Sequence, residues 1–259
     1  MLRKKNLYNT NSTEPYKLSR SKIDLFLQCP RCFYLDRRLG ISQPSGPPFT
    51  LNNAVDTLLK LEFDQCRDKR CVHPFVSGQG IEAIPFSHPE LENWRNNRIG
   101  IQYLDPKTNF LLYGAIDDVW ELPCGELVIV DYKAKATTGQ ITLEPKRKKN
   151  GEIYQTDRYL IGYVNQMEFY QWLYRKNGFR VSDIGYFLFA NAIKEREAFN
   201  NRLDFEKILL PHDGDMSWVD PTVGKIKKCL DADTIPDFSP DCSFCWYAQN
   251  ILSTSSEVI

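Results

Sequence analysis

Asp117, Asp131 and Lys133 are residues of this chain whose types and spacing could do chemistry together. Two carboxylates about 5 Å apart on one face of a β-sheet can share a divalent cation through their oxygens. A neighbouring ammonium can stabilise charge that develops on a phosphate oxygen. The set therefore indicates metal-assisted hydrolysis of a phosphodiester. The alternative interpretation is an ordinary solvated hairpin face, on which Lys133 pairs weakly with Asp131.

A β-hairpin is the element that has to position these side chains. Its two strands are rich in aromatic and β-branched residues, and the segment between them, Pro123-Cys124-Gly125, has the chemistry of a tight turn. A type I turn followed by Gly125 in the left-handed conformation would close the loop. The sequence then predicts that Leu122 pairs with Glu126, and this pair sets the register of the whole hairpin.

The predicted register decides which acidic residue belongs to the site. It places Asp117 opposite Asp131, with Lys133 on the same sheet face. Asp118 points to the other face. Asp131 also follows an apolar run, Leu127–Val130, that is typical of a strand buried on both faces. Because a charge at the end of a buried strand is costly unless it is paired or used, the functional interpretation is favoured.

Hydrophobic periodicity and turn residues predict the elements around the hairpin. Helices are expected over Leu51–Phe63, Asp157–Lys176 and Thr222–Leu230, and strands over His73–Val76, Ile81–Pro85, Ile184–Ala190 and Phe205–Leu210. This order of strands and helices indicates a mixed α/β fold. Residues 1–17 are expected to form a disordered terminus, and residues 18–259 a single domain.

Two of the expected helices carry polar residues that could serve the site. Val55, Leu58 and Leu59 are predicted to face the core, with Asp56 within reach of that side. The pair Gln166 and Tyr170 is spaced by four residues, so both lie on one face of their helix. Both could serve a site at the end of the hairpin, although such a pair is more often an ordinary boundary feature.

The composition is that of a globular protein, with 42% hydrophobic and 25% charged residues. The formal net charge is zero, so nucleic-acid binding would depend on local basic patches. Lys146–Lys149 is a basic run, although a solvated turn explains it at least as well. No apolar stretch approaches the length of a membrane span, and the first residues lack the apolar core of a signal peptide. We therefore expect a cytoplasmic protein with no membrane partner.

Four of the eight cysteines form two spaced pairs, Cys29-x2-Cys32 and Cys242-x2-Cys245. Each pair is spaced like half of a four-thiolate site, of the kind that holds zinc or an iron–sulfur cluster. The alternative is four buried small apolar residues. Two such pairs are much rarer by chance than one, which favours a metal site built from residues 18–48 and 232–250. The spacing alone does not choose between zinc and iron–sulfur.

The chain resembles the PD-(D/E)XK nucleases of the RecB type, and most closely the branch that contains CRISPR-associated exonucleases with terminal cysteines. Four stretches carry the resemblance in order, namely CPRCFYL, GAIDDV, VIVDYK and QMEFY, and the cysteine-containing tail follows them. Each motif is short, but their order and spacing extend over most of the chain. The resemblance implies a restriction-endonuclease-like core with helices on both sides of a mixed sheet, magnesium or manganese at the active site, and DNA as substrate.

The resemblance also implies roles for individual residues. Asp117 and Asp131 match metal ligands, and Lys133 matches the lysine that orients or activates the attacking water. Gln166 and Tyr170 match a Q-x3-Y helix that contacts DNA or supports the site.

Two positions depart from the pattern of the family. The family often has a histidine ligand on the helix before the hairpin, where this chain has Asp56, and a carboxylate suits magnesium or manganese at least as well. At the cysteine site, Cys29, Cys242 and Cys245 match cluster positions of that branch, while Cys32 stands in for a further downstream cysteine. The resemblance implies an iron–sulfur cluster there, with zinc as the alternative.

Residues and resemblance together predict a metal-dependent deoxyribonuclease. The expected activity is that of an exonuclease acting on single-stranded or end-exposed DNA in repair, recombination, or phage or CRISPR DNA processing, alongside other DNA-processing proteins. The rival hypothesis is a non-catalytic nucleic-acid-binding or assembly protein that keeps the nuclease fold. The presence of both aspartates and the lysine argues against the rival.

Overall fold

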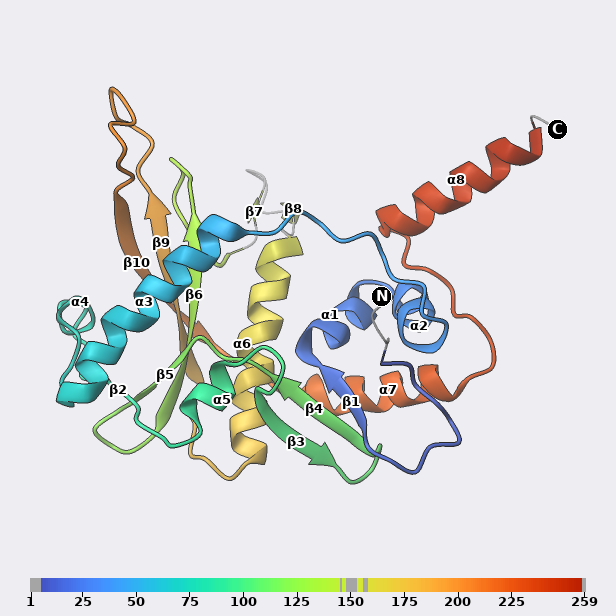
Figure 1. Cartoon of the computed structure of the whole chain (residues 1–259), viewed down its shortest axis with the longest axis horizontal. Helices are drawn as coiled ribbons and strands as arrows, with labels where there is room; N and C mark the ends of the chain where they lie inside the picture. Colours follow the sequence, from blue (N-terminus) through green and yellow to red (C-terminus); the bar gives the residue numbers. More distant parts are fainter. Residues whose placement is uncertain (1–5, 145, 148–152, 156–157, 258–259) are drawn as a thin grey trace. The chain divides into compact units, whose positions relative to one another are not determined.

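The structure is a computed structural model of the chain that describes residues 6–144, 146–147, 153–155 and 158–257 (Figure 1). Lys148 and Lys149 of the basic run, and the expected helix start at Asp157, lie outside the described residues. The mixed α/β class predicted from the sequence is confirmed. The chain divides into two compact units, unit 1 with Met1–Pro47, Leu104–Tyr113 and Ser217–Ile259, and unit 2 with Pro48–Tyr103 and Gly114–Met216.

Runs of helices and runs of strands follow one another along the chain. The helices are α1 (Arg20–Gln28), α2 (Pro30–Arg38), α3 (Thr50–Lys69), α4 (Pro74–Ser77), α5 (Leu91–Arg95), α6 (Arg158–Lys176), α7 (Val219–Asp231) and α8 (Ser243–Glu257). The strands are β1 (Tyr16–Ser19), β2 (Ile84–Pro85), β3 (Ile101–Asp105), β4 (Phe110–Gly114), β5 (Asp118–Glu121), β6 (Leu127–Lys135), β7 (Lys146–Arg147), β8 (Ile153–Gln155), β9 (Ile184–Ala192) and β10 (Phe205–Asp213). None of the helices in the described part of the chain is long and apolar enough to cross a membrane.

Unit 2 is built on a five-stranded sheet with the order β10-β9-β6-β5-β2. The central strand β6 runs parallel to β9 and antiparallel to β5. Its apolar run, Leu127–Val130, is fully buried, as the absence of polar residues predicts for a strand covered on both faces. The buried strand continues into Asp131, whose carboxylate is itself fully buried.

Each face of β6 is covered by one long helix, and Figure 1 shows α3 and α6 beside this strand. On one face, Val128 and Val130 pack in a core cluster with Leu59 and Phe63 of α3. Burying side chains of this size contributes about 1.5–3 kcal/mol each. Leu58, predicted to face this core, is instead 65% exposed, because one helical turn aligns Leu59 and Phe63 and leaves their neighbours on the outer side.

The β5–β6 hairpin has the predicted register. Asp118 pairs with Val130 and Glu121 with Leu127, so the next position along places Asp117 opposite Asp131. The turn closes as expected, because the Leu122 amide donates to the Glu126 carbonyl at 2.9 Å. Gly125 adopts the left-handed conformation, with φ of 78°.

Unit 1 contains the parallel pair β1 and β4 and the helices α1, α2, α7 and α8. The terminus expected to be disordered contains Tyr8, which is buried and whose hydroxyl donates to Asp231 at 2.7 Å. Tyr8 also packs edge-on against Tyr16 and Phe110. These aromatic contacts attach Tyr8 to the core of unit 1.

The expected short strand His73–Val76 is wrong. The segment forms the one-turn helix α4 instead, because the His73 ring accepts a hydrogen bond from the Phe75 amide at 3.1 Å and Pro74 occupies the first helical position. The other short strand, expected over Ile81–Pro85, is reduced to Ile84–Pro85.

Candidate active site and four-cysteine site

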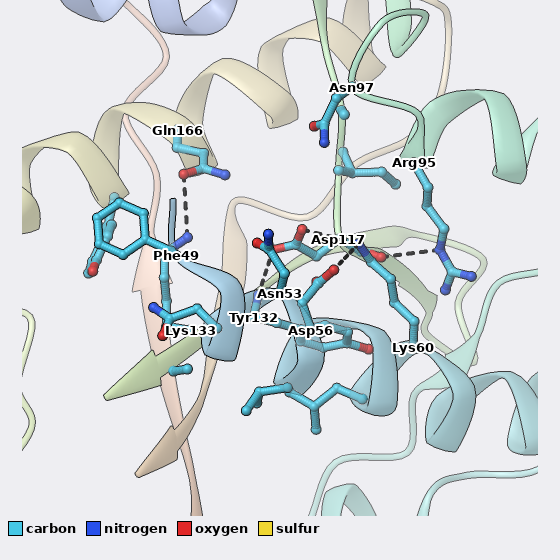
Figure 2. Close-up of a pocket in the computed structure, with 17 residues that line it drawn as sticks. Phe49, Asn53, Asp56, Lys60, Arg95, Asn97, Asp117, Tyr132, Lys133 and Gln166 are labelled. Atoms are coloured by element: carbon cyan, nitrogen blue, oxygen red, sulfur yellow. Dashed lines mark hydrogen bonds and ion pairs between the residues drawn. The ribbon is translucent and has the colours of Figure 1, made fainter. Parts of the chain in front are cut away.

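A pocket of about 410 Å³ in unit 2 gathers side chains from α3, α5, β6 and α6 (Figure 2). Asp56 and Lys60 come from α3, Lys133 from β6 and Gln166 from α6. Asp117, in the short segment before β5, lines the same pocket. Because the helices are anchored on opposite faces of β6, residues distant in the sequence meet where this strand leaves the core.

Asp131, Lys133 and Gln166 form one connected group. The amide nitrogen of Gln166 donates to Asp131 Oδ1 at 2.7 Å, and Lys133 Nζ lies 3.4 Å from the Gln166 carbonyl oxygen. Lys133 Nζ also forms an ion pair with Asp131 Oδ2 and lies 4.6 Å from the centre of the Tyr163 ring. The hydroxyl of Tyr170 is 3.5 Å from the Gln166 amide nitrogen. The structure thus brings both helix residues expected from their spacing to the hairpin.

Asp117 and Asp56 meet on the α3 side of the pocket. The backbone amide of Tyr132 donates to Asp117 Oδ2 at 2.9 Å, which fixes that carboxylate against β6. Lys60 Nζ lies 2.8 Å from Asp56 Oδ2 and 3.6 Å from Asp117 Oδ1. An ammonium therefore lies between these two carboxylates.

The charge of Asp117 raises the pKa of the two other carboxylates of the pocket. Burial raises the pKa of Asp131, the Lys133 ammonium lowers it, and the nearby charge of Asp117 raises it again, with a net upward shift. Burial also raises the pKa of Asp56, and Asp117 adds to this rise. Groups of like charge that are held out of water in this way favour a bound cation.

Asp118 lies outside the pocket and has a structural role. This agrees with the prediction that its side chain points to the sheet face opposite Asp117. Its buried carboxylate pairs with Arg67, accepts a hydrogen bond from the Tyr132 hydroxyl at 2.8 Å, and lies 3.1 Å from Arg95 Nη2. Arg95 Nε also donates to the Asp117 carbonyl at 3.2 Å. Asp118 therefore anchors the backbone that carries Asp117.

Sequence reasoning missed Lys60 and Arg95. Lys60 carried a usable signal, because it follows Asp56 by four residues and must share its helix face. Arg95 carried none, since its contacts with Asp117 and Asp118 span more than twenty residues of irregular chain.

The four cysteines of the two C-x2-C pairs meet inside unit 1, and all four are buried. Their sulfur atoms all lie within 4.8 Å of one another. Cys32 Sγ is 3.6 Å from Cys242 Sγ and 3.4 Å from Cys245 Sγ, and Cys29 Sγ is 3.7 Å from Cys245 Sγ. The remaining four cysteines, Cys66, Cys71, Cys124 and Cys229, are not members of this group.

Thiol acidity differs within the four-cysteine site. Burial raises the pKa of Cys32 to about 11. At Cys29 the effect of burial is outweighed by hydrogen bonds from the backbone amides of Cys32 and Ser239, which lower the pKa of this thiol to about 7. Four converging sulfurs, one of them readily deprotonated, form a donor set suited to a thiophilic metal.

Comparison with known protein families identifies the family of the chain. A model of the PD-(D/E)XK nuclease superfamily matches residues 17–249, and this range includes every residue of the pocket and both cysteine pairs. No curated protein matches the chain. Nucleases of this superfamily are phosphodiester hydrolases that use divalent metals on nucleic acid. The chain belongs to the PD-(D/E)XK nuclease superfamily.

Proposed function

We propose that the protein is a metal-dependent deoxyribonuclease, an exonuclease that acts on single-stranded or end-exposed DNA in repair, recombination, or phage or CRISPR DNA processing. The single observation that supports this most is the convergence of Asp117, Asp131 and Lys133 at one pocket, with Gln166 joining two of them. A non-catalytic protein that retains the fold would have no need of this arrangement.

The pocket fits magnesium or manganese. Asp56, Asp117 and Asp131 offer only oxygen donors, which these ions prefer. Among the described residues, Asp131 Oδ2 has no hydrogen-bond partner and is paired only with the Lys133 ammonium. The pKa values of Asp131 and Asp56 are both raised, which shows that positive charge beside these carboxylates is favourable. When bound there, the ion would polarise the phosphate and supply hydroxide at neutral pH.

The protein's own groups would then orient the reaction. In this proposal Lys133 would stabilise charge on a non-bridging phosphate oxygen and orient the attacking water. Gln166 holds the Asp131 carboxylate and the Lys133 ammonium in one geometry, and Tyr170 supports Gln166 from the next turn of α6.

The four-cysteine site fits a single zinc ion better than a cluster. A tetrahedral zinc with Zn–S bonds of about 2.3 Å places its sulfurs about 3.8 Å apart. The sulfurs here are separated by 3.4–3.7 Å in three of their pairs and by no more than 4.8 Å in any. The iron–sulfur cluster implied by the resemblance spreads its thiolates over several iron atoms and needs a wider site. We propose zinc with a structural role.

The nuclease proposal is tested with end-labelled single- and double-stranded DNA, both linear and circular, in the presence of Mn²⁺ or Mg²⁺. We expect linear DNA to be degraded from its ends and circular DNA to persist. Asp131→Ala should abolish cleavage, while Asp233→Ala, at an exposed aspartate of unit 1, should leave it unchanged. DNA binding without cleavage under any of these conditions would favour the non-catalytic rival, and cleavage of circular DNA would make the enzyme an endonuclease.

A further inference from the structure

Lys60 is a charged residue of the pocket that the proposed reaction leaves without a role. Its ammonium lies 2.8 Å from Asp56 Oδ2 and 3.6 Å from Asp117 Oδ1, and Figure 2 shows it beside both carboxylates. These are two of the three carboxylates assigned to the divalent ion. Lys133, in contrast, is committed to Asp131 and Gln166. The two lysines therefore neutralise different parts of one acidic pocket.

We propose that Lys60 is a positioning residue, a tethered cation that neutralises Asp56 and Asp117 in the metal-free protein and gives them up when a divalent ion binds. The inference rests on the proposed function, because it assumes that these carboxylates bind the ion. It assigns Lys60 a part in metal affinity and no contact with the substrate.

The spacing of the carboxylate oxygens supports this assignment. In the described part of the chain, the four cysteines gather their donor atoms within 4.8 Å of one another, whereas Asp56, Asp117 and Asp131 form no such group. A divalent ion would have to draw the three carboxylates closer around itself. The Lys60 ammonium, which lies between Asp56 and Asp117, neutralises their charges until the ion binds.

The Lys60 ammonium can move away from the two carboxylates because its backbone is fixed while its side chain is flexible. The preceding residue, Leu59, is buried in the core cluster with Phe63, so the backbone of α3 stays fixed on the sheet. The lysine side chain itself is 21% exposed and carries its charge on a four-carbon stem that can swing toward solvent. Displacement therefore requires a rotamer change and no movement of the helix.

Competition between lysine and metal has a measurable consequence. Each divalent ion that binds must replace the contacts of Lys60, so the wild-type protein binds the ion more weakly than a protein without this charge. A partly exposed ion pair is worth enough to change a dissociation constant about three- to tenfold. If Lys60 forms only an ordinary helix-surface pair with Asp56, removing its charge leaves metal affinity unchanged.

The experiment is a titration of the full-length protein with Mn²⁺ by isothermal calorimetry at one fixed neutral pH. Asp131→Ala serves as the blank that separates binding in the pocket from binding elsewhere. We expect Lys60→Met, which keeps the aliphatic stem and removes the charge, to lower the dissociation constant about three- to tenfold. Lys60→Arg keeps the charge and should bind Mn²⁺ about as the wild type does. Melting curves should show a larger Mn²⁺-induced rise in Tm for Lys60→Met than for the wild type.

A matched control is a lysine of β10 that pairs with a carboxylate on the same helix as Lys60. Lys207 pairs with Glu62 of α3 at 2.6 Å, outside the pocket, and Lys207→Met should leave Mn²⁺ affinity unchanged. Equal or weaker Mn²⁺ binding by Lys60→Met overturns the inference, and Lys60→Gln repeats the test if the methionine variant does not fold. A wild-type protein whose Mn²⁺ binding equals that of Asp131→Ala overturns the proposed metal site itself, a different result.

Discussion

The Gln166 side chain shows how one residue can organise the chemistry of two others. Its amide nitrogen donates to Asp131 at 2.7 Å and its carbonyl oxygen faces the Lys133 ammonium at 3.4 Å. An amide is suited to this position because it offers a donor to the carboxylate and an acceptor to the ammonium at once. Glutamate would lose the donor, and lysine the acceptor.

Asp36 gives a residue-scale prediction about pH in unit 1. Burial by itself would raise its pKa, but hydrogen bonds from Arg37, Lys22 and Ser42 lower it to about 2. Because the folded pKa lies below the usual value, the stabilisation is fully present at neutral pH and is lost as pH falls through about 4 toward 2. Asp36→Asn should therefore cost about 2 kcal/mol of unfolding free energy at pH 7.

The measurement is urea unfolding of both proteins at a series of pH values. The stability difference between wild type and Asp36→Asn should shrink as the pH approaches 2. Asp237→Asn removes an exposed carboxylate with a 3.9 Å contact to Arg31 and should not change stability at any pH. A difference that stays constant with pH would mean that Asp36 acts through packing and not through its charge.

The β5–β6 hairpin shows what could be predicted at the scale of an element. Pro123-Cys124-Gly125 determines the turn, the turn determines the register, and the register selects Asp117 over Asp118. Each of these steps depends on local chemistry, which a sequence displays. The helix α6 was predictable for the same reason, because its periodicity extends over several turns.

Short elements could not be predicted in the same way. At α4 a single histidine side chain and a proline start a helix of one turn in a segment whose composition also suits a strand. Likewise, the contact of Arg95 with Asp117 depends on how an irregular segment folds back onto the sheet. Neither feature has a repeating pattern from which it could be inferred.

Gly100 gives the prediction at this scale, because it holds the segment that leads to Asp117. It has φ of 64°, and a Cβ placed there would overlap the carbonyl of Gly114, with its carbon 2.6 Å away. Since backbone cannot move aside as a flexible side chain can, Gly100→Ala should cost more than about 2 kcal/mol. Gly80→Ala is the matched control, because Gly80 has φ of 75° but faces open space. It should cost about 1 kcal/mol.

Thermal and urea unfolding of both glycine variants measure this difference. Equal destabilisation of the two would show that the left-handed conformation, and not the close approach of Gly114, governs the cost. For the functional consequence, Gly100→Ala should also weaken Mn²⁺ binding, because the displaced segment carries Asp117.

At the scale of the whole molecule, sequence order and spatial order differ most in unit 1. Its three chain segments come from both ends and from the middle of the sequence. The meeting of Cys29 and Cys32 with Cys242 and Cys245 was predictable, since a four-thiolate site requires both pairs. That residues 104–113 belong to unit 1 could not be predicted. They join it because β4 pairs with β1 through backbone hydrogen bonds, and the amino-acid composition does not indicate which strands pair.

Metal at the four-cysteine site should stabilise unit 1 by closing a loop of more than two hundred residues. We expect anaerobically purified protein to be colourless and to hold one zinc per chain, since the spacing of the sulfurs suits a single tetrahedral ion. Removal of the zinc by a chelator under reducing conditions should lower Tm and speed amide hydrogen exchange in α1 and α2, next to Cys29 and Cys32. Restoring zinc should reverse both effects.

Two variants distinguish the effect of the bound metal from the effect of the cysteine side chains. Cys242→Ser should lose zinc and show the fast exchange without any chelator, whereas Cys124→Ser, at an exposed cysteine outside the site, should behave as the wild type does. A brown protein with visible absorption would indicate that the site holds an iron–sulfur cluster and not zinc. The sulfurs would then have to move apart when the cluster binds. Protein with neither metal, and with unchanged stability after chelation, would leave the four cysteines as a packed cluster of thiols, stabilised by their burial alone.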